Sequence, residues 1–215
     1  MSDLSNKRKN YEAGFFTESD LKENPMELFR DWFLQADAHP LIAEANAMSV
    51  STVENALIPR TRMVLLKQYT WEGFIFYTNY SGRKGSAIEA NPNVCLHFFW
   101  TALEKQVIIN GTAEKIAPNL SDGYFHSRPR KSQIGAIVSP QSRIIPNRDF
   151  LDQKSAEWEE KTKDWDEIPR PDYWGGYLVR PAQIEFWQGR PNRLHDRFLY
   201  TLQKDFNWKI ERLAP

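Results

Sequence analysis

The residues best suited to chemistry lie between Ile184 and Phe198, in the segment IEFWQGRPNRLHDRF. This segment carries arginines, a tryptophan and a histidine between two apolar stretches that are typical of strands. Guanidinium groups stack on flat rings and bind phosphate or carboxylate through paired donors, and histidine exchanges a proton near neutral pH. The pattern therefore predicts a loop that binds a planar anion and is mounted on rigid sheet, although a solvated basic turn is the alternative.

Two further basic clusters lie at expected element boundaries. Arg83 and Lys84 open SGRKGSAIEANP, a segment typical of a short helix, whose free amides and dipole favour an anion. Residues 128–132 follow a proline turn and supply more phosphate-type donors, with residues 141–143 nearby in sequence. Each cluster alone fits a solvated charged turn equally well. Together, in a neutral chain, they favour two small phosphorylated ligands.

Composition excludes several classes of protein. The 215 residues carry 28 Lys plus Arg against 28 Asp plus Glu, so no polyanion-binding surface covers the whole molecule and a nucleic-acid role is weak. The single cysteine, Cys95, rules out an internal disulfide framework and is interpreted as a buried structural thiol. We find no signal peptide and no run of membrane-spanning length, which predicts a soluble, cytoplasmic protein with no membrane partner.

The predicted elements indicate an α+β fold, mainly antiparallel β. Short runs of β-branched and aromatic residues predict strands at 47–53, 62–69, 73–79, 94–100 and 106–116. Residues 174–188 are expected to return to strands across a turn at Pro181. Helical spacing or boundary residues predict helices over 25–38, 81–92, 119–129 and 148–165. We expect a single domain over 21–215 and an N-terminal segment over 1–20 that is partly flexible.

Arg62 and Lys67 flank the apolar run MVLL. Side chains alternate along a strand, so one of the two is expected to serve a different site unless the strand bends.

Other kinds of site are not indicated. The chain has no glycine-rich dinucleotide fingerprint and no Walker loop. The histidines, at 39, 97, 126 and 195, lack metal-ligand spacing, so no metal site is predicted.

Long motifs in this order and spacing resemble pyridoxamine 5′-phosphate oxidases. They are RMVLLK, YTNYSGRKG, YFHSRPRKSQIGA, the QS at 141–142, WGGY and IEFWQGRPNRLHDRF. The resemblance runs from about Arg8 to Pro215. It implies an FMN-binding split β-barrel flanked by helices, in a homodimer with FMN at the subunit interface. It also implies oxidation of pyridoxamine 5′-phosphate or pyridoxine 5′-phosphate to pyridoxal 5′-phosphate by O2, releasing hydrogen peroxide, and ammonia from the amine.

The resemblance also implies which residues bind FMN and substrate. The cofactor-binding set is Arg62, Met63, Val64, Leu65, Leu66, Lys67, Tyr77, Thr78, Arg83, Lys84, Gln106, Gln141, Ser142, Trp187 and Arg197. The substrate-binding set is Arg8, Lys9, Asn10, Tyr11, Lys67, Tyr124, Arg128, Ser132, Arg193, Leu194 and His195, of which residues 8–11 match a segment that closes over the substrate as an active-site lid. Arg193 and His195 are the expected catalytic residues; His195 either moves a proton or acts as a scaffold.

Three alternatives stay open at this point. The fold also serves related flavin oxidases of other aromatic substrates and flavin proteins without turnover. The third hypothesis is a carrier that binds pyridoxal 5′-phosphate for delivery and holds no flavin.

Overall fold

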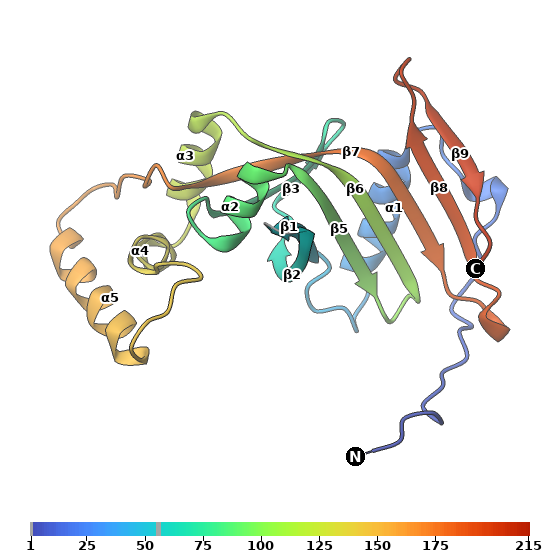
Figure 1. Cartoon of the computed structure of the whole chain (residues 1–215), viewed down its shortest axis with the longest axis horizontal. Helices are drawn as coiled ribbons and strands as arrows, with labels where there is room; N and C mark the ends of the chain where they lie inside the picture. The colour runs from blue at the N-terminus through green and yellow to red at the C-terminus, as the bar shows by residue number, and fades with distance from the viewer. Residues whose placement is uncertain (1, 55–56) are drawn as a thin grey trace.

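The computed structural model describes residues 2–54 and 57–215. Its helices are α1 (Pro25–Asp37), α2 (Arg83–Ala90), α3 (Pro118–Ser127), α4 (Arg130–Val138) and α5 (Arg148–Thr162) (Figure 1). Its strands are β1 (Ala47–Glu54), β2 (Ile58–Leu65), β3 (Gln68–Thr70), β4 (Gly73–Asn79), β5 (Asn93–Trp100), β6 (Lys105–Lys115), β7 (Trp174–Gln188), β8 (Asp196–Leu202) and β9 (Trp208–Arg212).

The described strands form one nine-stranded antiparallel sheet, and an antiparallel sheet is what the sequence predicts. Seven strands follow the order β2-β1-β5-β6-β7-β4-β3, while β8 branches from β7 and pairs in turn with β9. Strand β7 is the longest and pairs with β6 along almost its whole length. Its other edge is shared, since β4 pairs with residues 174–179 and β8 with residues 183–188. One strand therefore joins the two halves of the sheet.

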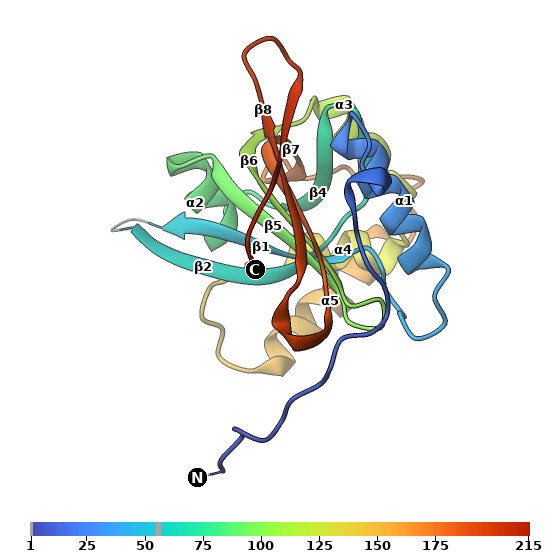
Figure 2. The same cartoon turned by 90° about the vertical axis from the view of Figure 1, so that its right-hand side faces the viewer.

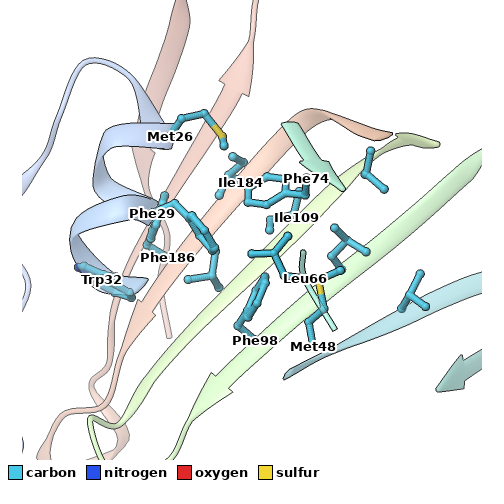
Figure 3. Close-up of a cluster of buried hydrophobic side chains, with 14 of the residues drawn as sticks. Met26, Phe29, Trp32, Met48, Leu66, Phe74, Phe98, Ile109, Ile184 and Phe186 are labelled. Carbon is cyan, nitrogen blue, oxygen red and sulfur yellow. The ribbon is translucent and has the colours of Figure 1, made fainter. Parts of the chain in front are cut away.

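Helix α1 covers the concave face of the sheet and closes the core (Figure 3). It begins at Pro25, and the Asn24 side chain caps it by accepting from the Met26 amide at 2.9 Å. Phe29, which is fully buried, lies at the centre of the helix's apolar face and packs edge-on against Phe74, with ring centroids 4.8 Å apart. The aromatic stripe of this helix is core packing, as the sequence predicts.

Helices α4 and α5 lie at one end of the molecule, away from α1 (Figures 1 and 2). A second, smaller cluster of buried side chains joins this end to the sheet, with Phe125, Ile134, Ile168 and Trp174 at its centre. Helix α4 is not among the helices that the sequence predicts, because residues 128–132 are interpreted there as phosphate-type donors or a solvated charged turn. The helix is stabilised by contacts with α3 and α5, among them Gln133 Nε2 to the His126 carbonyl and Arg130 to the Thr162 carbonyl.

Two predicted features of the sheet are wrong in detail. The strand expected over 62–69 ends at Leu65 and restarts at Gln68, because Leu66 turns into the core. No turn interrupts β7 at Pro181; the strand continues through a bulge opposite Asn110 and Gly111. Gly111 is needed there, since a Cβ at this position would lie 2.1 Å from the Arg180 carbonyl oxygen.

Cys95 is half-buried in β5 and its thiol donates to the Leu96 carbonyl at 3.6 Å. Over residues 2–54 and 57–215, no helix combines the length and the hydropathy that crossing a bilayer requires.

Replacing Phe29 by alanine is expected to lower the free energy of unfolding by roughly 3–5 kcal/mol, because it leaves a cavity under five aromatic neighbours. Urea denaturation measures the change. Leu34→Ala, on the same helix but 54% exposed, is the matched control and should cost less than about 0.5 kcal/mol. Equal losses in the two variants would contradict this account of the core.

Candidate functional site

A cleft of about 710 Å³ opens between the end of β2, strand β4 and helices α3 and α4. It brings together eleven of the predicted site residues: Met63, Val64, Leu65, Lys67, Tyr77, Thr78, Lys84, Tyr124, Arg128, Ser132 and Gln141. These residues come from segments up to 78 positions apart, so only the fold assembles them. We call this cavity the phosphate cleft.

One wall of the phosphate cleft is aromatic. The rings of Tyr77 and Tyr124 stack with centroids 3.9 Å apart, and Trp174 lies parallel to Tyr77 at 5.5 Å. The guanidinium of Arg128 lies over the Trp174 ring at 4.7 Å. Trp174, at the start of β7, was quoted in the WGGY motif but was given no role, because its position beside Arg128 depends on tertiary contact.

Arg128 is the cation most clearly prepared for a ligand. Its Nη1 is buried, and in the parts of the chain that the structure describes it has no hydrogen-bond partner. Burial lowers the pKa of Arg128 while Tyr124 opposes that shift, and the group stays charged at neutral pH. Ser132 lines the same cleft from the first turn of α4.

The basic residues between 128 and 132 do not all line the phosphate cleft. Arg130 turns away from the cleft and donates to the Thr162 carbonyl at the end of α5. Lys131 is exposed and does not line the cavity. The resemblance already named Arg128 and Ser132 and left out Arg130 and Lys131, whereas the basic cluster by itself gave no reason to choose among them, because that requires knowing which side of α4 faces α5.

A second cation, Lys84, lies at the opposite end of the phosphate cleft. It is buried in the first turn of α2, donates to the Thr78 hydroxyl and lies 3.3 Å from Gln141 Oε1. Burial, with a smaller contribution from the Arg62 charge, lowers the pKa of Lys84 to about 8. A helix start beside a buried ammonium is an arrangement that favours an anion.

Arg62 and Arg83 lie beside this end of the cleft without lining it. Arg62 Nη1 donates to the Thr52 hydroxyl at 2.7 Å, and burial lowers the pKa of Arg62. Arg83 and Ser142 line an adjoining cavity of about 280 Å³, and Gln141 is shared between the two cavities. Lys67 lies past the end of β2 and lines the cleft, so Arg62 and Lys67 do occupy different places.

A separate cavity of about 880 Å³ lies at the other end of β7, and we call it the histidine cavity. It is lined by Lys7, Arg8, Lys9, Asn10, Tyr11, Trp187, Arg190, Asn192, Arg193 and His195. Among the described residues, none lines both this cavity and the phosphate cleft. One chain therefore does not bring the two predicted groups together.

The histidine ring has a defined protonation state at neutral pH. Burial and the charges of Arg193 and Arg197 lower the pKa of His195, with Asp196 opposing them. His195 Nδ1 accepts from the Arg190 amide at 3.1 Å, which places the proton of the neutral ring on Nε2. The ring lies against Trp187, with centroids 4.6 Å apart. The neutral imidazole therefore presents its Nε2–H as a hydrogen-bond donor.

Arg193 lies on a strained turn at the rim of this cavity. Asn192 and Arg193 both have left-handed backbone, with φ of 57° and 64°. Two consecutive non-glycine residues in this region are uncommon and accumulate at functional loops.

The remaining predicted residues line neither cavity. Gln106 and Arg197 lie on the strands on either side of Trp187, where Gln106 contacts His97 and Arg197 pairs with Glu185 at 2.8 Å. Leu66 is buried in the core, and Leu194 is 70% exposed. Besides Trp174, the lining residues missed from sequence include Asn79 and Arg190, which carry no distinctive spacing.

Comparison with known proteins agrees with this layout. Residues 34–162 match the model described as pyridoxamine 5′-phosphate oxidase, and residues 174–215 match the pyridoxine 5′-phosphate oxidase C-terminal dimerisation region. A pyridoxine/pyridoxamine 5′-phosphate oxidase of Flavobacterium psychrophilum is 55% identical over 100% of both chains, and one of Trichormus variabilis is 48% identical over 99% of this chain and 98% of its own.

The chain belongs to the pyridoxamine 5′-phosphate oxidase family. It is an oxidoreductase, and membership of the family confirms the predicted cofactor, FMN.

Solved structures confirm the split-barrel fold of the family. PhzG of Burkholderia lata, solved with tetrahydrophenazine-1-carboxylic acid, superposes with a TM-score of 0.86 at 25% identity, covering 94% of this chain and 98% of its own. An FMN-binding protein of Nostoc punctiforme related to pyridoxamine 5′-phosphate oxidase has a TM-score of 0.69 at 13% identity, covering 91% of this chain and 100% of its own, and supports the fold alone.

Metal ligation is not part of the described site. Across residues 2–54 and 57–215, no three His, Cys, Asp or Glu side chains are grouped closely enough to hold a metal ion.

Inorganic phosphate should bind the free protein more weakly as pH rises from 7 to 9.5. The pKa of Lys84 is about 8, so its ammonium, which favours the anion, is lost across this range. Lys84→Gln should weaken binding by roughly tenfold at pH 7 and flatten the pH dependence. Calorimetric titration measures both effects.

Lys154→Gln, which changes an exposed lysine on α5, is the control and should behave like the parent protein. A Lys84→Gln variant with the parental pH dependence would exclude Lys84 from the anion site.

Proposed function

We propose that this chain, as a homodimer, oxidises pyridoxamine 5′-phosphate and pyridoxine 5′-phosphate to pyridoxal 5′-phosphate, with FMN as cofactor and O2 as electron acceptor. The alcohol yields the aldehyde and hydrogen peroxide. The amine also consumes water and releases ammonia. The observation that carries the proposal is Arg128 Nη1, which is buried without a hydrogen-bond partner among residues 2–54 and 57–215, in a cleft that also holds Lys67, Tyr124 and Ser132.

The residues of the phosphate cleft fit two phosphate groups. Arg128, Lys67, Tyr124 and Ser132 supply donors for the substrate phosphate at one end. At the other end, Lys84, the start of α2 and Gln141, with Arg62, Arg83 and Ser142 beside them, suit the FMN phosphate and ribityl chain. Met63, Val64, Leu65, Tyr77 and Thr78 supply a mixed apolar wall between the ends that suits a flat ring.

Gly82 lets the Gln141 side chain approach the start of α2. A Cβ on Gly82, the N-cap residue of α2, would lie 2.7 Å from Gln141 Oε1, so a larger residue would displace that amide. The same approach places Gln141 beside Lys84.

The histidine cavity supplies the opposite side of the site. Residues 174 and 187 line different cavities and are thirteen positions apart on one strand, which is roughly 40 Å at the usual rise per residue. A phosphorylated pyridine is far shorter than that. Arg193 and His195 therefore complete a site with the phosphate cleft of a second copy, and both lie in the segment that matches a dimerisation region.

The chain's own groups have simple roles in this scheme. When bound, FMN would accept the hydride from the substrate and pass the electrons on to O2. Arg128 and Lys67 fix the substrate phosphate, and Arg193 of the partner copy orients the carbon that is oxidised. His195, neutral with its proton on Nε2, donates a hydrogen bond to the substrate's polar groups. The segment at residues 8–11 excludes water from the site when substrate is bound.

The first test records the visible spectrum of the purified protein and adds pyridoxamine 5′-phosphate without oxygen. Bleaching of the flavin absorbance that reverses in air, with pyridoxal 5′-phosphate and hydrogen peroxide formed, is the expected result. Bound flavin that stays oxidised would refute the proposed substrate. Tetrahydrophenazine-1-carboxylic acid, the compound in the PhzG structure, serves as the comparison substrate for the alternative of a related oxidase.

Arg128→Ala is expected to raise the Michaelis constant for pyridoxamine 5′-phosphate by roughly 10- to 100-fold, because a buried charged donor to the phosphate is lost. Steady-state kinetics and flavin content are the measurements. Lys131→Ala, an exposed neighbour, should change the constant by less than about twofold. An effect of Arg128→Ala confined to flavin retention would show that the two phosphate positions are exchanged.

Arg193→Ala is expected mainly to lower turnover while flavin stays bound. Co-expressing it with Arg128→Ala should restore activity, because a mixed dimer has one site with both arginines intact; random pairing predicts about a quarter of the parental activity. Mixed dimers without recovery would place both arginines in one subunit's site.

A further inference from the structure

The buried carboxylate of Glu104 lies outside every group of residues predicted to act in the site. Glu104 is in the tight turn between β5 and β6, with a φ of 52°, and is only 3% exposed. Burying a charged carboxylate is costly unless its oxygens are paired. The partners of Glu104 therefore identify what this carboxylate holds in place.

Both oxygens of Glu104 bind the N-terminal segment. Oε1 pairs with Lys9 Nζ at 2.7 Å, and Oε2 accepts from the Ala13 amide at 2.8 Å. Burial alone would raise the pKa of Glu104, but the Lys9 ammonium and the amide donors outweigh it, so the pKa is lowered and the group is ionised at neutral pH. A residue 91 positions away thus anchors both ends of residues 9–13.

The backbone of Glu104 holds the surface against which this segment packs. Its carbonyl accepts from the Gly189 amide at 2.8 Å and from Gln188 Nε2 at 3.2 Å. Gly189 in turn makes room for Tyr11, since a Cβ on Gly189 would lie 2.8 Å from Tyr11 Cγ. One residue therefore fixes both the segment and the surface beneath it.

Tyr11 lies between these anchors and reaches the histidine cavity. Its ring meets Trp187 edge-on at 5.6 Å and lies 5.8 Å from the His195 ring. Beyond Ala13, the next attachment is Phe16, whose amide donates to Asp196 Oδ2 at 3.1 Å and whose ring is buried against Phe198. Without Glu104, the segment before Phe16 would lose the charged contact and the amide contact that hold it on the sheet.

We propose that Glu104 is a positioning residue that fixes residues 9–13, and through them Tyr11, against Trp187 and His195. Its effect on catalysis rests on the proposed function, whereas its effect on the segment does not. Because the partners of Glu104 are the Lys9 side chain and one amide, the attachment can break and reform without unfolding the sheet.

Glu104→Gln tests the proposal in the flavin-loaded protein. The amide replaces one acceptor with a donor facing Lys9, so hydrogen exchange of the Ala13 amide and its neighbours in residues 9–14 should accelerate about tenfold. Exchange in β6 and β7 should stay unchanged. The Michaelis constant for pyridoxamine 5′-phosphate should rise severalfold, with a smaller change in turnover and no loss of flavin.

Two further variants keep the test interpretable. Lys9→Met removes the ion pair from its exposed end and leaves the turn intact, so it should give a smaller acceleration in the same segment even if Glu104→Gln is unstable. Glu114→Gln is the matched control, because Glu114 lies on β6 in an exposed pair with Arg180. It should match the parent protein in both exchange and kinetics.

Unchanged exchange in residues 9–14 of both Glu104→Gln and Lys9→Met would overturn the anchoring role. Faster exchange with an unchanged Michaelis constant would overturn the positioning of Tyr11 for catalysis. Failure of the proposed function itself would appear differently, as a parent protein that does not oxidise pyridoxamine 5′-phosphate while its exchange pattern still depends on Glu104.

Discussion

Strand β7 is the constraint on which the rest of the structure depends. It is hydrogen-bonded to β6 along almost its whole length, and its other edge is divided between β4 and β8. A strand held in this way cannot shorten, so Trp174 and Trp187 stay at opposite ends of the molecule. The two cavities are separated for the same reason, and the proposed site therefore draws on a second copy of the chain.

The phosphate cleft is organised around cations that the fold removes from water. Lys84 is 8% exposed at the start of α2, and Arg128 lies over Trp174 with a buried nitrogen that has no hydrogen-bond partner among the described residues. Holding charge in such places opposes folding unless an anion offsets it. Under the proposed function, binding of FMN and of the substrate phosphate is therefore expected to stabilise the folded chain.

The histidine cavity is organised by carboxylates instead. Asp196 accepts from the Phe16 amide and pairs with Arg190 and Arg212, Glu185 orients Arg197, and Glu104 binds Lys9 and the Ala13 amide. Asp196 and Glu104 thereby hold the N-terminal segment and the loop between β7 and β8 in place, and Glu185 holds Arg197 on the neighbouring strand.

The sequence by itself determined the antiparallel class, the position of α1, a short helix within residues 81–92 and, through long motifs, the family and the choice of Arg128 over Arg130. These features depend on local patterns: alternation, helix capping and motif spacing. It could not show that the Arg130 side chain is held at the end of α5, that Pro181 lies in a bulge, or that Trp174 and Glu104 support the two cavities. Those facts depend on contacts between residues far apart in the chain, and only the packing of α4 on α5 and of the N-terminal segment on the β5–β6 turn decides them.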